Sequence, residues 1–396
     1  MTNQQVRLRM SEEKRFQKGY PLILQDYIER LPELQEGELF DLVGAQGTYY
    51  GTAYYGVQNK GIGWIVSKDP VTQLDRAYFM KLFKKAYQLR QDLHDDPNTN
   101  AYRIMNGEGD HFGGLTVDLY NDQLLLQWYS EGAYSFRRII YDVLMEVVQP
   151  RSVYEKKRFD RGGEYIEQDD FVMGETTTFP QMVKQDGIQY AIDLNDGPMT
   201  GVFLDQREVR RYLRDELAEG KTVLNTFSYT GAFSVAALLG GAKSTTSVDL
   251  AKRSEAKTIE QMSINGIDFE AQEIRVMDVF NYFNYAERHQ MKWDVVVLDP
   301  PSFARSKKMS FSTSKDYDML IERAANVTAR KGTIIASTNT ASLDMKKFKK
   351  LIEEGMRKAG RNYKIVEEFH LPSDFRTPRS FREFDYLKVL ILQLKN

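Results

Sequence analysis

The stretch VLNTFSYTGAFSVAALLGGAKSTTSVD, residues 223–249, decides the fold class of this chain. An apolar strand runs into a turn of small residues, a helix of small and apolar residues follows, and a second strand ends on Asp249. This order of strand, turn, helix, strand and acid is how an α/β sheet binds a nucleoside-containing cofactor. The turn lets the ligand approach the backbone, and the acid accepts hydrogen bonds from ribose hydroxyls.

The turn itself excludes one class of cofactor. It lacks the G-x-G-x-x-G fingerprint of dinucleotide binders and keeps only Gly231 at the helix start, which disfavours a nicotinamide cofactor. Asp249 follows Gly231 by 249 − 231 = 18 positions, near the spacing of about 20 expected for a ribose-binding acid. The alternative is that Asp249 only caps the next helix. Asp278, in RVMDVF, would end the third strand and could accept from an adenine amino group.

A regular alternation of strands and helices begins near residue 190. Strands are expected near 222–226, 244–249, 272–277, 294–298, 332–337, 363–369 and 386–392. Helices are expected near 206–218, 231–240, 252–264, 316–329 and 344–359. This pattern predicts a mostly parallel sheet covered by helices on both faces.

The sequence VVVLDPPSF places Asp299, Pro300 and Pro301 directly after a buried strand. Two prolines lock the loop and remove two amide donors, so carbonyl groups and the Asp299 carboxylate are expected to face a substrate. Phe303 could stack on a base, a contact worth about 1–3 kcal/mol. The alternative is a rigid loop with a core phenylalanine.

Basic residues follow this loop without an intervening acid, which suits contacts to nucleic-acid phosphates. They are Arg305, Lys307, Lys308 and Lys315. Similar clusters occur at Arg7, Arg9, Lys14, Arg15 and Lys18, and at Arg151, Lys156, Lys157, Arg158 and Arg161. Each cluster alone is equally compatible with an ordinary solvated face.

Composition limits the chemistry more than it identifies it. The chain has 396 residues, a net charge of −2 and no cysteine, which excludes disulfides, zinc–thiolate sites and thiol nucleophiles. The four histidines lack metal-ligand spacing, so no metal is expected. The N-terminus has no apolar signal core, and no apolar run approaches the ~20 residues that cross a bilayer. We therefore expect a cytoplasmic protein with no membrane partner.

The first half of the chain has a different pattern. Residues 1–70 contain alternating apolar and polar runs broken by Gly44 and Gly47, which suits a small β-barrel. Residues 72–95 have apolar residues at helical spacing and end before Pro97, as expected of a connecting helix. Residues 100–185 alternate strand and helix.

These motifs together resemble the bacterial 23S rRNA large-subunit methyltransferases that carry an N-terminal PUA domain. The resemblance covers nearly the whole chain and rests on TGVFLDQREVRRYL (200–213), VLNTFSYTGAFS (223–234), SVDLAKRS (247–254), MDVF (277–280) and LDPPSF (298–303). It implies a PUA barrel at 1–70, a connecting helix and central α/β domain at 71–188, and a Rossmann-like class I methyltransferase domain at 189–396. The implied cofactor is S-adenosylmethionine and the implied partner is 23S ribosomal RNA.

Carried over by position, the resemblance also names site residues. The cofactor-binding set would be Phe203, Asp205, Gln206, Arg207, Asn225, Phe227, Ser228, Tyr229, Gly231, Asp249, Asp278 and Asp299. The RNA-binding set near the loop would be Phe303, Arg305, Lys307 and Lys308.

The chain departs from that family in one respect. Members that methylate cytosine at carbon 5 carry a cysteine after the strand that follows the DPP loop, because a thiolate must add to the ring to activate that carbon. Here Asn339 or a neighbour occupies the position.

The loop sequence DPPSFARSKKMSFSTSKDYDML instead resembles sister enzymes that modify guanine at nitrogen 7, which has its own lone pair. Asp299 and Pro300 would then align the base and stabilise charge, and Asn339 would hold a base edge. Cytosine carbon 5, an exocyclic amine and a noncatalytic RNA-binding role stay open as alternatives, as does a homodimer.

Overall fold

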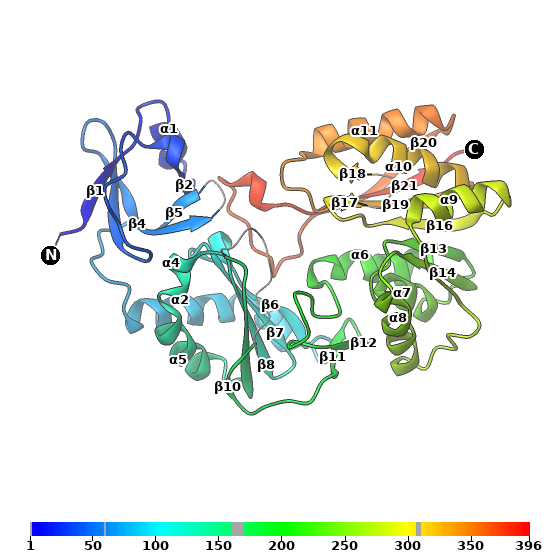
Figure 1. The fold of residues 1–396 in the computed structure, drawn as a ribbon, viewed down its shortest axis with the longest axis horizontal. Helices are drawn as coiled ribbons and strands as arrows, with labels where there is room; N and C mark the ends of the chain where they lie inside the picture. The colour runs from blue at the N-terminus through cyan, green and yellow to red at the C-terminus, as the bar shows by residue number, and fades with distance from the viewer. Residues whose placement is uncertain (1, 59–60, 160–169, 306–309) are drawn as a thin grey trace. The chain divides into compact units, whose positions relative to one another are not determined.

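A computed structural model describes residues 2–58, 61–159, 170–305 and 310–396 (Figure 1). The chain forms two compact units. The first unit comprises 1–184, 192–200 and 373–382, and the second comprises 185–191, 201–372 and 383–396. Within the described residues, no helix is long and apolar enough to span a membrane.

The N-terminal part of the first unit is a five-stranded sheet in the order β1-β3-β4-β5-β2. Its elements are β1 (Gln4–Arg7), α1 (Glu13–Gln17), β2 (Leu22–Leu24), β3 (Leu39–Val43), β4 (Tyr49–Gln58) and β5 (Gly61–Ser67). Phe40, Tyr54 and Trp64 are buried on it. The alternating runs of the sequence therefore form strands, as expected.

The central part of the first unit begins with α2 (Arg76–Gln88), whose N-cap Asp75 accepts a hydrogen bond from the Tyr78 amide at 2.9 Å. Helix α3 (Gln91–His94) follows it. A second five-stranded sheet has the order β10-β9-β8-β7-β6. Its elements and the helices that accompany it are β6 (Ala101–Asn106), β7 (Leu115–Tyr120), β8 (Gln123–Trp128), α4 (Glu131–Tyr134), α5 (Arg137–Val147), β9 (Ser152–Lys157) and β10 (Phe171–Gly174). A two-strand ribbon follows, with β11 (Gln181–Gln185) and β12 (Ile188–Ile192).

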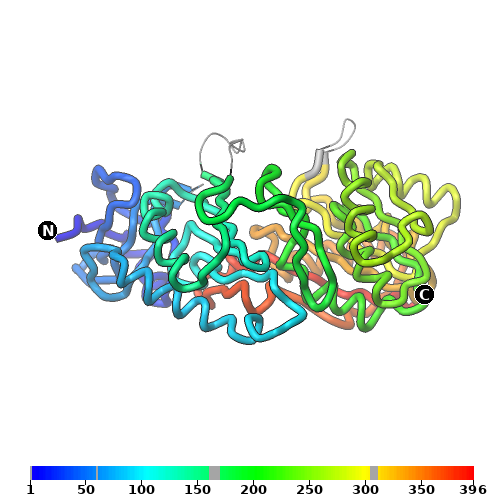
Figure 2. The backbone as a smooth tube through the Cα atoms, turned by 90° about the horizontal axis from the view of Figure 1, so that it is seen from below, coloured from blue at the N-terminus to red at the C-terminus, as the bar shows by residue number. Residues whose placement is uncertain are grey.

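A segment from near the C-terminus belongs to this first unit. Residues Ser373–Arg382, which we name the strap, contact strand β6 and the turn between α1 and β2, and the strap is the red stretch beside the cyan part of the tube in Figure 2. The Asp374 carboxylate accepts from the Arg103 amide at 2.9 Å, and the Ser380 hydroxyl donates to the Gly19 carbonyl at 2.7 Å. Phe381 is buried with its ring 5.0 Å from that of Tyr20.

The second unit is built on a seven-stranded sheet in the order β15-β14-β13-β16-β19-β21-β20. The strands are β13 (Thr222–Thr226), β14 (Ser244–Asp249), β15 (Glu273–Val276), β16 (Trp293–Leu298), β19 (Thr328–Thr338), β20 (Tyr363–Phe369) and β21 (Lys388–Leu394). The first five strands pair in parallel, and β21 pairs antiparallel with both β19 and β20. The predicted mostly parallel sheet is confirmed.

Helices cover both faces of this sheet (Figure 1). One core contains side chains of α9 (Val279–Arg288), α10 (Thr313–Val327) and α11 (Met345–Lys358). The opposite core contains side chains of α6 (Arg207–Tyr212) and α7 (Ala232–Leu239), beside which α8 (Arg253–Ile264) lies. The single helix expected at 206–218 divides into a 3₁₀ turn, α6 and a π-helical segment Leu213–Leu217, and α9 was not expected at all.

Candidate active site at the edge of the parallel sheet

The candidate residues gather at one edge of the seven-stranded sheet. The turn 227–231 follows β13, Asp249 ends β14, Asp278 follows β15, and Asp299 follows β16. Because these four strands are parallel and adjacent in the order β15-β14-β13-β16, their carboxyl ends meet at the same edge. This edge is where open α/β sheets bind their ligands.

The turn after β13 has a compact left-handed backbone. Phe227, Tyr229 and Gly231 have φ values of 53°, 51° and 79°. The Ser228 amide donates to the Val248 carbonyl at 3.1 Å, which ties the turn to the neighbouring strand. A Cβ on Gly231 would lie 2.6 Å from a methyl carbon of a helix α8 residue, so a glycine is needed there for both its backbone and its packing.

Asp249 holds this turn in place. Its Oδ2 accepts from the Tyr229 amide at 2.9 Å, and its Oδ1 accepts from the Ala251 amide at 2.8 Å. The carboxylate thus has a structural role, but it is not the cap raised as the alternative, because the N-cap of α8 is Lys252. Each carboxylate oxygen has a second lone pair, so this role is compatible with accepting from a ligand hydroxyl.

Asp278 has a role that the sequence reading missed. It is the N-cap of α9 and accepts from the Asn281 amide at 3.0 Å. The preceding amide, of Met277, donates to the Asp249 carbonyl at 2.8 Å, which joins the ends of β14 and β15. The cap fixes the position of the Asp278 carboxylate at the sheet edge.

The segment before α6 contributes a buried glutamine that contacts Asp299. Gln206 donates from one amide nitrogen to Asp299 Oδ1 at 3.0 Å and to the Ser337 hydroxyl at 2.8 Å. Burial, together with the neighbouring charge of Asp205, raises the pKa of Asp299 to about 6. Asp205 in turn accepts from the Tyr386 hydroxyl at 2.8 Å.

Three further residues of the predicted cofactor set lie around this cluster. Phe203 is exposed with its ring 5.2 Å from that of Tyr229, whose hydroxyl accepts from the Gly201 amide at 2.9 Å. Arg207 is buried at the start of α6. Asn225 is buried in β13 and donates to the Ser234 hydroxyl at 3.0 Å.

Of the buried side-chain oxygens that have no hydrogen-bond partner within the described residues, two belong to the predicted cofactor set: Oε1 of Gln206 and Oδ1 of Asn225. Buried polar atoms are normally satisfied, so orphans of this kind point to a bound ligand or water. Both belong to the set that the resemblance assigned to the cofactor.

Two carbonyl groups of the DPP loop are hydrogen-bonded within the protein. The Pro301 carbonyl accepts from the Thr313 hydroxyl at 2.9 Å, and the Ser302 carbonyl accepts from the Thr313 amide at 3.1 Å. These two carbonyls fasten the loop to the start of α10, a role that the sequence did not predict. Each carbonyl oxygen has a second lone pair, so the expectation that loop carbonyls face a substrate stays a prediction. Pro300 is buried.

Asn339 lies just beyond β19 and is exposed. Its side-chain oxygen accepts from the Ser302 hydroxyl at 2.8 Å, and the Thr340 hydroxyl donates to Ser302 at 3.0 Å. This chain of hydrogen bonds links Asn339 to the DPP loop and leaves its amide N–H groups directed elsewhere.

The predicted RNA-binding residues lie partly within the described structure. Phe303 is 60% exposed and begins β17 (Phe303–Arg305), which pairs with β18 (Ser310–Ser312). Arg305 pairs with Ser310 in this ladder, and Lys307 and Lys308 lie outside the described residues.

One member of the more distant basic clusters does not lie on the surface. Lys156 is buried in the first unit, where its ammonium group donates to Asp170 at 2.9 Å and to the Leu194 carbonyl at 3.1 Å. It therefore cannot contact RNA. In the parts of the chain that the structure covers, no group of three or more His, Asp or Glu side chains is arranged to hold a metal ion.

Comparison with known proteins agrees with this geometry. A sequence model described as S-adenosylmethionine-dependent methyltransferase matches residues 153–386, and one described as PUA-like domain matches residues 6–68. The chain is 50% identical over 391 residues to a Bacillus subtilis protein called "Putative ribosomal RNA large subunit methyltransferase YwbD", covering 98% of this chain and 99% of the relative. It is 30% identical to ribosomal RNA large subunit methyltransferase I of Aeromonas salmonicida, covering 89% and 87%.

Solved structures show the same similarity. A crystal structure titled as a "putative methyltransferase complexed with SAH" superposes with a TM-score of 0.92 at 40% identity, over 99% of this chain and 100% of that chain. A methyltransferase structure from Streptococcus mutans gives a TM-score of 0.90 at 39% identity, over 98% and 100%.

Proposed function

Because the chain belongs to the S-adenosylmethionine-dependent methyltransferases and carries a PUA-like domain, we propose that it methylates a base of large-subunit ribosomal RNA, at nitrogen 7 of guanine. The names of its relatives support ribosomal RNA as the substrate. The absence of cysteine from all 396 residues is the observation that supports the acceptor atom.

The residues at the sheet edge fit the cofactor of this family. Asp249 would hold the ribose and Asp278 the adenine amino group, while Gly231 and the left-handed turn let the cofactor approach the backbone. The unpartnered oxygens of Gln206 and Asn225 are acceptors that a bound cofactor would satisfy. S-adenosylmethionine supplies an electrophilic methyl group on a positively charged sulfur.

The rest of the cofactor set would support these contacts. Phe203 and Tyr229 form an aromatic pair at the sheet edge, and Asp205 and Arg207 flank Gln206 on the segment that enters α6. Phe227 and Ser228 fix the shape of the turn. We propose that all of these residues orient the cofactor and that none of them takes part in the methyl transfer itself.

The choice of acceptor atom rests on the absence of a thiol nucleophile from the chain. Carbon 5 of cytosine must first be activated by a nucleophile that adds to the ring, and a thiolate is absent. Nitrogen 7 of guanine already has a lone pair, so catalysis reduces to alignment and electrostatic stabilisation. Cytosine carbon 5 is therefore the second candidate, favoured only by the resemblance.

Asp299 and Asn339 would orient the base. Gln206 and Ser337 hold Asp299 at the end of β16. Asn339 has amide N–H groups that suit a base oxygen, because its own oxygen is occupied by Ser302. Pro300 keeps the loop rigid between these two side chains, and exposed Phe303 would stack on a base, with Arg305, Lys307 and Lys308 at phosphates.

The wider organisation is part of the proposal. The PUA-like part, 1–70, and the central part, 71–188, would hold RNA, while 189–396 carries the transfer reaction. A cytoplasmic location follows from a ribosomal substrate, and no metal is required by this chemistry.

Two readouts on ribosomal RNA test the acceptor atom. In the assay, the purified protein is incubated with large-subunit RNA from cells that lack this protein. Borohydride followed by aniline should then cleave that RNA at the modified residue, because a 7-methylguanine ring is positively charged. RNA with fluorinated cytosine should trap no covalent adduct. The Asp299→Ala variant should retain cofactor binding and lose most of the rate, as a control for enzyme-dependent modification. Recovery of 5-methylcytosine instead would refute nitrogen 7 as the acceptor.

A noncatalytic RNA-binding role is the remaining alternative. It predicts that the purified protein binds RNA and S-adenosylhomocysteine without any methyl incorporation into that RNA. The same assay therefore separates it from both methylation reactions.

A further inference from the structure

The strap, Ser373–Arg382, alternates anchored residues with exposed arginines. Asp374, Phe375 and Phe381 are buried in the first unit, whereas Arg376, Arg379 and Arg382 are exposed. Beyond the contacts of Asp374 and Phe381 already described, the Arg376 carbonyl accepts from the Asn106 amide at 2.9 Å. The three guanidinium groups are therefore presented by a backbone that is fixed on both sides.

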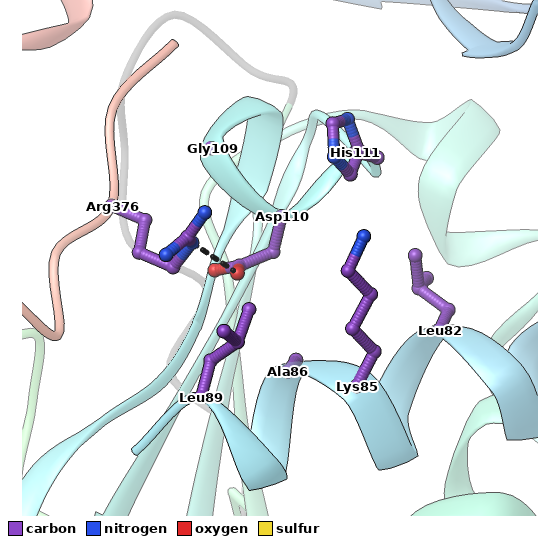
Figure 3. Close-up of a pocket in the computed structure, with 8 residues that line it drawn as sticks. All are labelled: Leu82, Lys85, Ala86, Leu89, Gly109, Asp110, His111 and Arg376. Carbon is purple, nitrogen blue, oxygen red and sulfur yellow. Dashed lines mark ion pairs between the residues drawn. The ribbon is translucent and has the colours of Figure 1, made fainter.

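A small hollow lies where the strap passes helix α2 (Figure 3). Its lining residues are Leu82, Lys85, Ala86, Leu89, Gly109, Asp110, His111 and Arg376. In Figure 3 the side chains of Lys85, His111 and Arg376 surround the hollow, and they come from α2, the turn after β6 and the strap. Three segments that are distant in sequence thus bring an ammonium, an imidazole and a guanidinium group to one place.

The one carboxylate in the hollow is already neutralised. Asp110 is buried and makes two hydrogen bonds with the buried Arg90, at 2.8 and 2.6 Å. The Arg376 guanidinium lies 3.4 Å from the same carboxylate as an additional cation. One negative charge therefore faces two guanidinium groups, and Lys85 adds a further positive charge that the carboxylate does not balance.

The pKa of His111 is shifted by this excess of positive charge. Burial lowers the pKa of His111, and the charges of Lys85, Arg376 and Lys68 lower it further, whereas Asp110 alone opposes them. Cations from α2, the strap and the residue after β5 thus act on one imidazole in the same direction. His111 is kept neutral at physiological pH and can donate a hydrogen bond without adding charge.

An ordinary solvated basic face is the simpler interpretation of exposed arginines. Two features favour a binding surface instead. The strap is anchored by buried side chains, so little backbone conformational entropy is lost when its arginines bind a ligand, and the excess positive charge occurs in a chain whose net charge is −2. Arg379 and Arg382 have no ion-pair partner among the described residues.

We propose that Lys85, Arg376, Arg379 and Arg382 form a docking surface for the phosphate backbone of the RNA substrate, which rests on the proposed function. The planar guanidinium matches a phosphate with two parallel hydrogen bonds, and Lys85 adds a point charge. This surface positions the RNA without reading its sequence. It lies outside the PUA-like sheet and the candidate active site.

The test is a salt titration of RNA affinity with a matched control. The variant Lys85→Gln/Arg379→Gln/Arg382→Gln removes three charges and leaves the Arg376–Asp110 ion pair intact. The control Lys346→Gln/Lys347→Gln/Arg357→Gln removes three exposed charges from α11 in the second unit. Affinity for unmodified large-subunit ribosomal RNA is measured by fluorescence anisotropy between 50 and 300 mM salt, with thermal unfolding and S-adenosylhomocysteine binding recorded for both variants.

The strap variant should bind the RNA at least tenfold more weakly at low salt. The slope of log affinity against log salt should fall by about 2–3, since each lost phosphate contact removes about 1. The control should keep the wild-type slope, and both variants should keep wild-type unfolding and S-adenosylhomocysteine binding.

An unchanged slope in the strap variant overturns the proposal, and the strap would then be a candidate contact for a protein instead of RNA. An equal loss of RNA affinity in the control variant also overturns it. Methyl incorporation by the wild-type protein reports on the proposed function alone, and the difference in slope reports on the strap alone. The two proposals therefore fail separately.

Discussion

Replacing Asp299 by Asn should stabilise the protein at neutral pH while slowing methyl transfer. The folded protein raises the pKa of this carboxyl to about 6, mainly by burial and then by the charge of Asp205. At pH 7–8 the ionised form is therefore held in surroundings that disfavour it. Asparagine has a similar shape, keeps an oxygen for the Gln206 donor, and removes the charge.

The magnitude can be worked from the shift. A pKa of about 6 against an ordinary value of 3.8 corresponds to about 3 kcal/mol of unfavourable free energy, at ~1.4 kcal/mol per pH unit. Asp299 keeps part of its surface accessible to solvent, so the realised gain should be about 1–2 kcal/mol. A gain of that size raises the melting temperature of a domain of 150–250 residues by about 2–4 °C per kcal/mol.

The pH dependence of folding stability shows in which direction the two proteins should differ. Between the ordinary pKa of 3.8 and the folded pKa of about 6, the native state binds more protons than the unfolded state. Stability of the wild-type protein therefore falls as pH rises through this window and becomes constant above it. The Asn variant lacks this dependence, so its advantage should be largest above pH 7 and should vanish near pH 4.

Thermal unfolding without ligand at pH 8, 6 and 4.5 measures this difference. The Asp196→Asn variant, which neutralises an exposed carboxylate of the first unit, is the matched control and should show no gain. A lower melting temperature for Asp299→Asn at pH 8 would refute the reasoning, as would a difference that is independent of pH. The same variant should transfer methyl groups at least tenfold more slowly if the charge of Asp299 assists the reaction.

Two further outcomes are expected. The Asp249→Ala variant should bind S-adenosylhomocysteine about ten- to hundredfold more weakly by calorimetry, a loss of ~1–3 kcal/mol, because it removes both the ribose acceptor and the bond to the Tyr229 amide; wild-type affinity would remove Asp249 from the site. The Gly109→Ala variant should lower stability by about 1–3 kcal/mol in denaturant unfolding, because its Cβ would lie 1.7 Å from the Arg376 carbonyl oxygen; an unchanged midpoint would show that the strap is not held against this turn.

The fold of the second unit was predictable because its strands and helices alternate regularly along the sequence. Strand β14 ends on Asp249, and the buried strand β16 is followed at once by Asp299, so both acids could be placed at the sheet edge from the sequence. Helix α9 was missed although its signal is present: Asp278 caps it, and Val279, Tyr282, Phe283 and Ala286 follow at helical spacing. Asp278 was interpreted as the end of a strand and an acceptor for an adenine amino group, and not as a helix cap.

Other features had no local signal. Gln206 contacts Ser337 across 131 positions, and the Asp374 carboxylate contacts the Arg103 amide across 271. The strap has neither helical nor strand periodicity, so only tertiary contacts reveal that it belongs to the first unit. The bonds from Thr313 to the loop carbonyls were not foreseen for the same reason, because Thr313 lies at the start of another element.

The position of the strap in the chain has a consequence for how the protein is made. A ribosome synthesises the N-terminal sheets first, yet the residues that bury against Arg103, Asn106 and Tyr20 are added after more than 370 others. Domains usually fold as units in the order in which they emerge, but this first unit can complete its packing only when synthesis is nearly finished. A nascent chain that stalls before Ser373 would therefore expose an unfinished first unit, whatever the state of the second.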